Sequence, residues 1–117
     1  MNKREFVRNL YECVDNLDAQ NLKEFLSENI SFKFSNFDEL NGVSDVIASN
    51  ENFFKSVKRM QHSITKIWEI EDDIICHGIV NYTRHNDSMY SASYSTILKV
   101  EDEKIVEYLI FADVSGL

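Results

Sequence analysis

The first part of the chain carries two helical patterns. Residues 3–17 place their apolar side chains at helical spacing, with charged or polar residues between them. Asp18 is positioned to cap a second, short helix that continues to about Leu26, because an aspartate side chain readily accepts a hydrogen bond from the first turn. Two amphipathic helices are therefore expected before the first strand.

A strand and a third helix follow. Apolar and polar residues alternate over residues 30–35, which predicts a half-buried strand. Asn41-Gly42 is a turn signal. After this turn a helical pattern runs from Val46 to Met60, with Ser44 as its expected cap.

From His62 onward the pattern changes to long runs of β-branched and aromatic residues. Polar breaks at residues 71–73, 85–88 and 101–103 separate four such runs. Short breaks predict hairpins, and consecutive hairpins predict an antiparallel meander. Helices followed by strands indicate an α+β fold, with three helices of the N-terminal half packed on a strongly curved, mainly antiparallel sheet. Such a sheet can form a cone with an internal pocket.

Composition narrows the class of protein. The chain has 117 residues, no proline and no linker-like segment, so one domain spanning residues 1–117 is expected. Twenty acidic and 12 basic residues give a formal net charge of -8, which argues against nucleic acid and anionic membrane as partners. No apolar run has the length of a signal peptide or a spanning helix, so a cytoplasmic protein is expected. Cys13 and Cys76 are expected to be free buried thiols.

The C-terminal half carries a recognisable order of residues. A histidine opens one strand, an apolar-Trp pair follows, a tyrosine lies near the end of the next strand, and an aspartate closes the last strand. In this order and spacing the chain resembles the SnoaL-like family of the nuclear-transport-factor-2-like superfamily, whose fold is a cystatin-like α+β cone. The residues concerned are His62, Ile67-Trp68, Tyr82-Thr83-Arg84 and Asp113. The chain departs from the family's usual Asp-Gly hairpin turns at Asn86-Asp87 and Asp102-Glu103.

The resemblance implies a function class without fixing a reaction. It implies a protein that binds a small apolar or aromatic molecule in the cone pocket, with cofactor-free isomerase, cyclase or epoxide-hydrolase-like acid–base chemistry. A non-catalytic hydrophobic-ligand carrier and a structural dimerisation module are the alternatives. It also implies a homodimer formed through the outer face of the sheet. No cofactor is expected, and the three histidines and two cysteines lack metal-ligand spacing.

Asp113 and His62 are the candidate catalytic residues. Because side chains alternate across a strand, Asp113 shares a face with Phe111, and both point into the pocket if Phe111 does. A carboxyl group in apolar surroundings suits general acid–base work, whereas a strand-end aspartate facing water is the alternative. His62 is expected roughly opposite Tyr82, and a histidine that is simply hydrogen-bonded at a helix-to-strand junction is the alternative. Lys66 shares the face of His62, so either Lys66 leaves the pocket at its rim or the facing changes along the strand. The expected pocket-lining residues are Tyr11, Phe34, Trp68, Tyr82, Tyr94 and Phe111.

Overall fold

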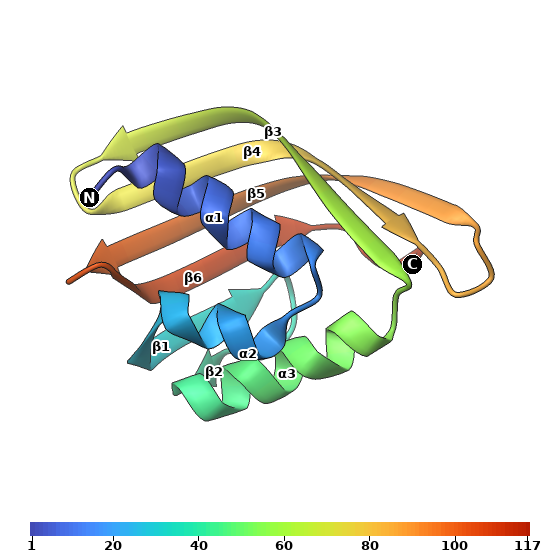
Figure 1. Cartoon of the computed structure of the whole chain (residues 1–117), viewed down its shortest axis with the longest axis horizontal. Coiled ribbons are helices and arrows are strands. Elements are labelled where there is room, and N and C mark those ends of the chain that lie inside the picture. Colours follow the sequence, from blue (N-terminus) through green and yellow to red (C-terminus); the bar gives the residue numbers. More distant parts are fainter.

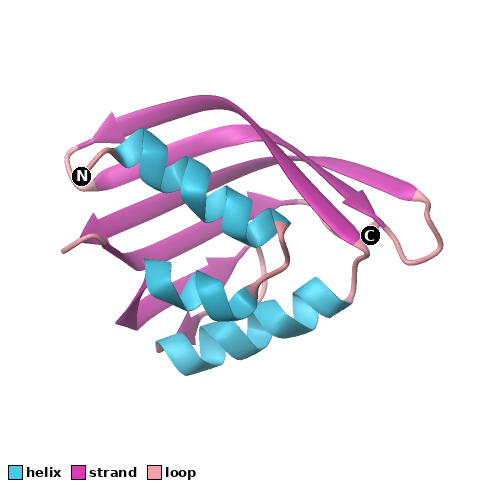
Figure 2. Cartoon of the chain, in the orientation of Figure 1, coloured by secondary structure: helices cyan, strands magenta, loops and turns pink.

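Three helices lie on one face of a curved six-stranded sheet (Figures 1 and 2). The computed structural model describes residues 1–117. Helix α1 packs on strand β3, α3 packs on strands β1 and β2, and α2 lies between α1 and α3. The helices are α1 (Lys3–Asp15), α2 (Ala19–Leu22), which continues into a 3-10 turn (Lys23–Phe25), and α3 (Val43–Lys55).

The sheet has the order β2-β1-β6-β5-β4-β3. Strands β3 to β6 form the predicted antiparallel meander. Strand β1 pairs with β6 in parallel, so the sheet is mixed, and it does not close into a barrel. The predicted α+β cone with helices on one face is confirmed. The strands are β1 (Leu26–Phe34), β2 (Leu40–Asn41), β3 (Arg59–Ile70), β4 (Asp73–Thr83), β5 (Met89–Glu101) and β6 (Lys104–Ala112).

The helix boundaries follow local capping chemistry. Asp18 caps α2 as predicted, its carboxylate accepting a hydrogen bond of 3.0 Å from a backbone N–H of the helix. The prediction that Ser44 caps α3 is wrong: Gly42, with a φ of 94°, occupies the cap position, and Ser44 lies inside the first turn. The helix ends at Lys55, and Met60 belongs to β3.

A β-bulge interrupts β3 and reverses which side chains face inward. Ile64 lies opposite Gly78 and Lys66 lies opposite His77, so Thr65 is the extra residue. A Cβ atom on Gly78 would lie 2.0 Å from the carbonyl oxygen of Ser63, so glycine is required for this close approach. The change of face resolves the expected difficulty with Lys66, which points outward, away from the concave side.

A second bulge lies at Val106 in β6. Val100 pairs with Ile105, whereas the next pair along the ladder joins Lys99 to Glu107. Ile105 and Tyr108 are therefore both buried on the concave side, although residues three positions apart on a regular strand face opposite sides. Every residue beyond the bulge has the opposite facing from the one that simple alternation predicts.

The core fills the space between the helices and the concave face of the sheet. The two cysteines are free and buried there, as expected.

The last hairpin turn has Asp102 and Glu103 with φ of 50° and 63°, the left-handed geometry that a two-residue turn requires. No helix combines the length and apolar character needed to cross a bilayer. The largest fully buried side chains include Leu10, Leu22, Ile30, Ile74, Leu98 and Ile105.

Candidate functional site

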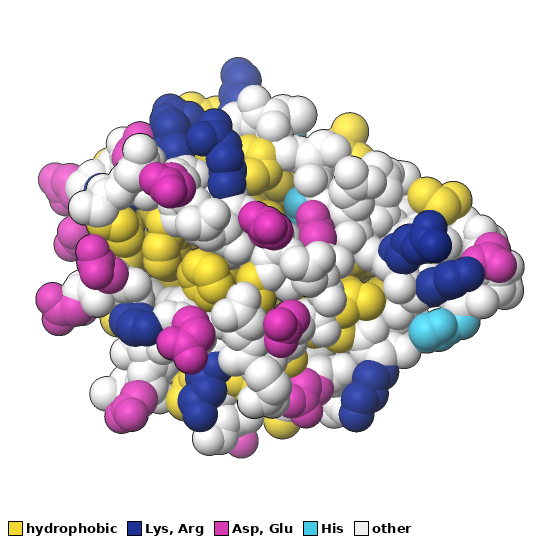
Figure 3. Space-filling view, viewed as in Figure 1, with side chains coloured by type: hydrophobic (Ala, Val, Ile, Leu, Met, Phe, Trp, Pro, Cys, Tyr) yellow, Lys and Arg dark blue, Asp and Glu magenta, His cyan; other side chains and the backbone are white.

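A cavity of about 600 Å³ lies between the concave face of the sheet and the helices. Its volume is in the range of small-molecule sites. Sixteen of its 23 lining residues are hydrophobic, so the cavity is mainly apolar. On the helical face, hydrophobic side chains show between the helices and are surrounded by charged ones (Figure 3). The aromatic lining residues are Tyr11, Phe32, Phe34, Phe37, Phe53, Phe54, Tyr82, Tyr94 and Tyr108.

The structure brings five of the eight predicted site residues together around this cavity. They come from five different elements: helix α1 and strands β1, β3, β4 and β5 contribute one side chain each to a shared surface. His62 lies opposite Val80, and Tyr82 is paired with Met60, so the expected register of β3 and β4 is off by two residues. The five lining residues are Tyr11, Phe34, His62, Tyr82 and Tyr94.

The other three predicted site residues lie outside the cavity. Trp68 is 43% exposed on the outer face, because the bulge at Thr65 shifts it away from the side that His62 faces. Phe111 is 50% exposed on the same outer face, because the bulge at Val106 shifts the facing of β6. The expected inward orientation of these side chains is wrong.

Asp113 is exposed just beyond β6 and does not line the cavity. Its carboxylate accepts hydrogen bonds from the backbone N–H of Ser115 (3.0 Å) and from the Ser115 hydroxyl (2.6 Å). These bonds hold the pKa of Asp113 below its ordinary value. The carboxylate is thus a satisfied, water-facing group at a strand end, and the geometric premise for its role in acid–base chemistry is wrong.

His62 instead has a carboxylate partner that sequence reasoning did not identify. Asp15, the last residue of α1, accepts a hydrogen bond of 2.6 Å at Oδ1 from the Nδ1 of His62. Its Oδ2 accepts a second bond of 2.9 Å from the backbone N–H of His62. The His62 side chain is 9% exposed and that of Asp15 is 22% exposed, so the pair is largely shielded from solvent.

This arrangement fixes the chemistry of the imidazole. A carboxylate only accepts, so Nδ1 carries the proton and Nε2 is left as the basic nitrogen of the neutral ring. The rings of Tyr11 and Tyr94 hold the imidazole between them, with centroid distances of 4.5 and 4.9 Å. An oriented histidine at the wall of an apolar cavity can accept a proton at Nε2 and return it.

The phenols beside His62 differ in their partners. The hydroxyl of Tyr11 is hydrogen-bonded to the Thr96 hydroxyl at 2.7 Å. The hydroxyl of Tyr94 is buried and has no partner in the protein. Buried polar groups normally have a partner, so an unpaired phenol beside a cavity points to a ligand or water that completes it.

Burial also keeps the phenols protonated. It raises the pKa of Tyr82 to about 12 and the pKa of Tyr11, Tyr94 and Tyr108 well above that of free tyrosine. All four side chains line the cavity. A free phenol is already neutral at physiological pH, and burial keeps these four hydroxyls neutral into more alkaline solution, so they can donate hydrogen bonds.

One signal in the sequence could have identified Asp15. It lies four residues after Tyr11, and residues at this spacing share a face of a helix. Val14 and Leu10 place the buried stripe of α1 beside this pair. A carboxylate at the edge of an apolar stripe, one turn after a tyrosine, is a candidate site residue on that ground.

The chain matches the sequence model of a known family. The sequence model of the family described as SnoaL-like domain matches residues 7–108. No curated protein matches the chain. No group of three or more His, Cys, Asp and Glu side chains is arranged to hold a metal ion.

Solved structures share the fold at low sequence identity. A candidate polyketide cyclase from Xanthomonas campestris pv. campestris is 15% identical, with a TM-score of 0.86 over 97% of this chain and 91% of the other. A protein from Catenulispora acidiphila with a ketosteroid isomerase-like fold, in complex with trimethylamine, is 12% identical, with a TM-score of 0.85 over 95% and 87%. An epoxide hydrolase of the LEH-like type from M. tuberculosis is 13% identical, with a TM-score of 0.81 over 95% and 82%.

Proposed function

The chain belongs to the SnoaL-like domain family, and we propose that it binds a small, mostly apolar molecule in the cavity and performs acid–base chemistry on it with His62. One observation carries the proposal: an imidazole oriented by Asp15 packs against the ring of Tyr94, whose hydroxyl is unpaired, and both side chains line an apolar cavity. These are a base and a hydrogen-bond donor within one site.

The proposed chemistry is a proton transfer on a carbonyl-containing or enolisable substrate. The neutral Nε2 of His62 takes a proton from a carbon next to the carbonyl group, and the electron pair moves onto the carbonyl oxygen. Tyr94 donates a hydrogen bond to that oxygen, and Asp15 stabilises the imidazolium. Where a carbon–carbon double bond is conjugated with the enolate so formed, the electron pair returns from the oxygen through the conjugated system, and the imidazolium returns the proton to its far carbon. The double bond has then moved, the substrate is isomerised, and both side chains regain their starting states.

The comparisons support the class of ligand and leave the reaction open. One structure with the same fold is an epoxide hydrolase and another holds trimethylamine. Both descriptions concern proteins less than a sixth identical to this chain, so their chemistry enters here only as support for a small-molecule site.

A non-catalytic carrier is the second candidate. The observation in its favour is that 16 of 23 lining residues are hydrophobic, which suits retention of an apolar molecule without turnover. A carrier needs the cavity and the Tyr94 hydroxyl but gains nothing from a basic nitrogen. Substitution of His62 distinguishes the two functions, because it abolishes turnover and leaves simple binding nearly intact.

We also propose that the outer face of the sheet forms a homodimer. Four apolar side chains lie directly opposite one another on successive strands: Trp68 beside Ile75, Ile75 beside Ile97, and Ile97 beside Leu109. Phe111 adds a half-exposed ring on the same face. A second copy of the chain would cover this row, whose apolar character matches the centre of homodimer interfaces.

The test is a ligand screen followed by turnover measurements. Thermal shifts would be measured with aromatic ketones, terpenoids and steroids, and products of each stabilising compound would be followed by NMR. We expect His62→Gln to lower turnover by about 10²-fold or more and Tyr94→Phe to lower it by about tenfold or more. Asp113→Asn is the matched control, because the exposed Asp113 should leave turnover unchanged. Turnover that survives His62→Gln would refute the acid–base role.

A further inference from the structure

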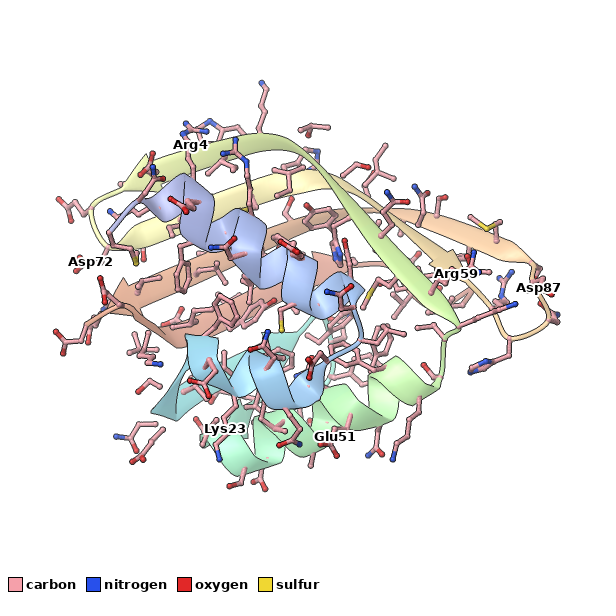
Figure 4. The ribbon with its side chains drawn as sticks, viewed as in Figure 1. Arg4, Lys23, Glu51, Arg59, Asp72 and Asp87 are labelled. Carbon is pink, nitrogen blue, oxygen red and sulfur yellow. The ribbon has the colours of Figure 1, made fainter.

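Cationic side chains are excluded from the cavity. None of the 23 lining residues is Lys or Arg. The labelled cations Arg4, Lys23 and Arg59 lie on the outer surface, away from the ring-filled space between the helices and the sheet (Figure 4). The carboxylates are distributed differently, because Asp38 lines the cavity and Asp15 lies behind His62. The chain as a whole has a net charge of -8.

The mouth of the cavity combines a carboxylate with aromatic rings. Phe37 is 65% exposed and neighbours the exposed Asp38, and both line the cavity. The ring of Phe34 lies 6.0 Å, centroid to centroid, from Phe37 on one side and from Phe53 on the other. Aromatic faces attract cations, and quaternary ammonium groups are bound by clusters of such rings. A carboxylate beside the rings adds a formal counter-charge.

The cavity has no comparable set of groups to stabilise an anionic ligand. A carboxylate taken into an apolar cavity requires a cationic partner. The one lining group able to become cationic is His62, and Asp15 already occupies its Nδ1. With the imidazolium between them, a bound carboxylate would still face the Asp15 carboxylate. Asp38 would repel the bound carboxylate as well.

From these observations we infer that the mouth, defined by Phe34, Phe37, Asp38 and Phe53, is a subsite for a tertiary or quaternary ammonium group. The ligand class is an apolar molecule that carries such a group at one end, with its body in the cavity. The inference rests on the proposed binding function and adds selectivity for charge: cations bind more tightly than neutral isosteres, and carboxylates are rejected.

Three naphthalene probes of nearly equal size test this selectivity by calorimetry. They are 2-naphthylmethyl-trimethylammonium, 2-naphthylmethanol and 2-naphthoate. We expect the cation to bind about fivefold more tightly than the alcohol, and the carboxylate to bind at least about tenfold more weakly. Asp38→Asn should remove most of the preference for the cation, measured in that variant as the ratio of the affinity for the cation to the affinity for the alcohol.

Glu39→Gln is the matched control for the charge of the same loop. Glu39 is exposed, lies next to Asp38 and does not line the cavity, so its loss changes the net charge equally without touching the subsite. It should preserve the preference for the cation. If the alcohol binds and the cation binds no better, or if Glu39→Gln acts like Asp38→Asn, the ammonium subsite is overturned and the binding function stands. If none of the three probes binds, both proposals fail.

Discussion

Asp15 holds His62 through both its backbone and its ring. One carboxylate oxygen accepts the backbone N–H at 2.9 Å and the other accepts from Nδ1 at 2.6 Å. The two residues lie 47 positions apart, at the end of α1 and within β3. The direction of Nε2 is therefore set by how α1 packs on the sheet, and the proposed base is fixed by the fold itself.

Replacement of Asp15 by asparagine should cost stability and lower activity. The amide retains one acceptor oxygen, so one of the two bonds is lost and the charge assistance of the other disappears. We expect a loss of about 1–3 kcal/mol in the free energy of unfolding, measured by urea denaturation. Asp72→Asn is the control, since Asp72 is exposed in a turn and should change stability by less than about 0.5 kcal/mol. Equal losses in the two variants would show that the Asp15–His62 contact contributes nothing specific.

Tyr94→Phe and Tyr11→Phe should affect stability in different ways. Removal of the Tyr94 hydroxyl deletes a buried group without a partner, so the ligand-free protein should lose no stability. Removal of the Tyr11 hydroxyl leaves the buried Thr96 hydroxyl unpaired and should cost about 1–2 kcal/mol. Urea denaturation of both variants measures the difference. A larger loss for Tyr94→Phe would mean that its hydroxyl already has a partner in the ligand-free protein.

The sequence predicts the fold well because the fold depends on periodicity. The meander of β3 to β6 follows from long β-branched runs broken by short polar segments. The inward facing of Tyr82 and Tyr94 follows from alternation, since β4 and β5 pair without any register shift. Where the strand pairing has no register shift, the alternation of side chains along the strand identifies the cavity-lining residues.

The alternation of side chains along a strand predicts the wrong facing beyond a β-bulge, because the bulge adds a residue. Trp68 lies beyond the bulge at Thr65, and Phe111 and Asp113 lie beyond the bulge at Val106, so all three have the reversed facing. The inserted residues themselves do not indicate the bulges, because Thr65 and Val106 are ordinary strand residues. The Asp15–His62 contact was missed for a different reason: it depends on how α1 docks on β3, which local periodicity does not determine.

Gly78 is the one residue whose type indicates a bulge, and its substitution should reduce stability strongly. In Gly78→Ala the added Cβ would lie 2.0 Å from the carbonyl oxygen of Ser63, which is backbone and cannot turn aside. We expect a loss of more than about 2 kcal/mol in the free energy of unfolding. Ser93→Ala, an exposed change on the neighbouring strand, should be nearly neutral. A nearly neutral Gly78→Ala would refute the close approach of β3 and β4.

Stability should fall in alkaline solution. Burial raises the pKa of Cys13 and Cys76 from 9.0 to about 11 and that of Tyr82 from 10.0 to about 12. The unfolded chain therefore releases these protons at lower pH than the folded chain does. The stabilisation is fully present below about pH 9 and is lost as the pH rises through 11 and 12.

Two measurements check this pH dependence. The free energy of unfolding in urea should decrease steadily from about pH 9 upward. The ultraviolet absorbance of tyrosinate should appear at higher pH in the native protein than in urea, because the pKa values of Tyr11, Tyr82, Tyr94 and Tyr108 are raised. Superimposable titrations of the native and urea-unfolded protein would contradict the burial of these phenols.

The proposed dimer should dissociate when a charge enters its apolar row. Trp68→Glu places a carboxylate opposite Ile75 on the outer face and should shift the protein from dimer to monomer in light scattering after gel filtration. Phe37→Glu is the control, because Phe37 is also an exposed aromatic residue but lies at the mouth of the cavity. A monomeric wild-type chain, or a dimer that survives Trp68→Glu, would exclude this interface.

The most direct test of the central claim is a chemical-shift map of the protein with a neutral aromatic ligand such as 2-naphthylmethanol. Binding in the cavity should shift the ring resonances of His62 and Tyr94 together with those of Phe53, which lies across the cavity on α3. The outer-face residue Trp68 should remain unshifted. Saturable shifts at His62 and Tyr94 are the predicted result, and shifts confined to the outer face, or none at saturating ligand, would contradict it.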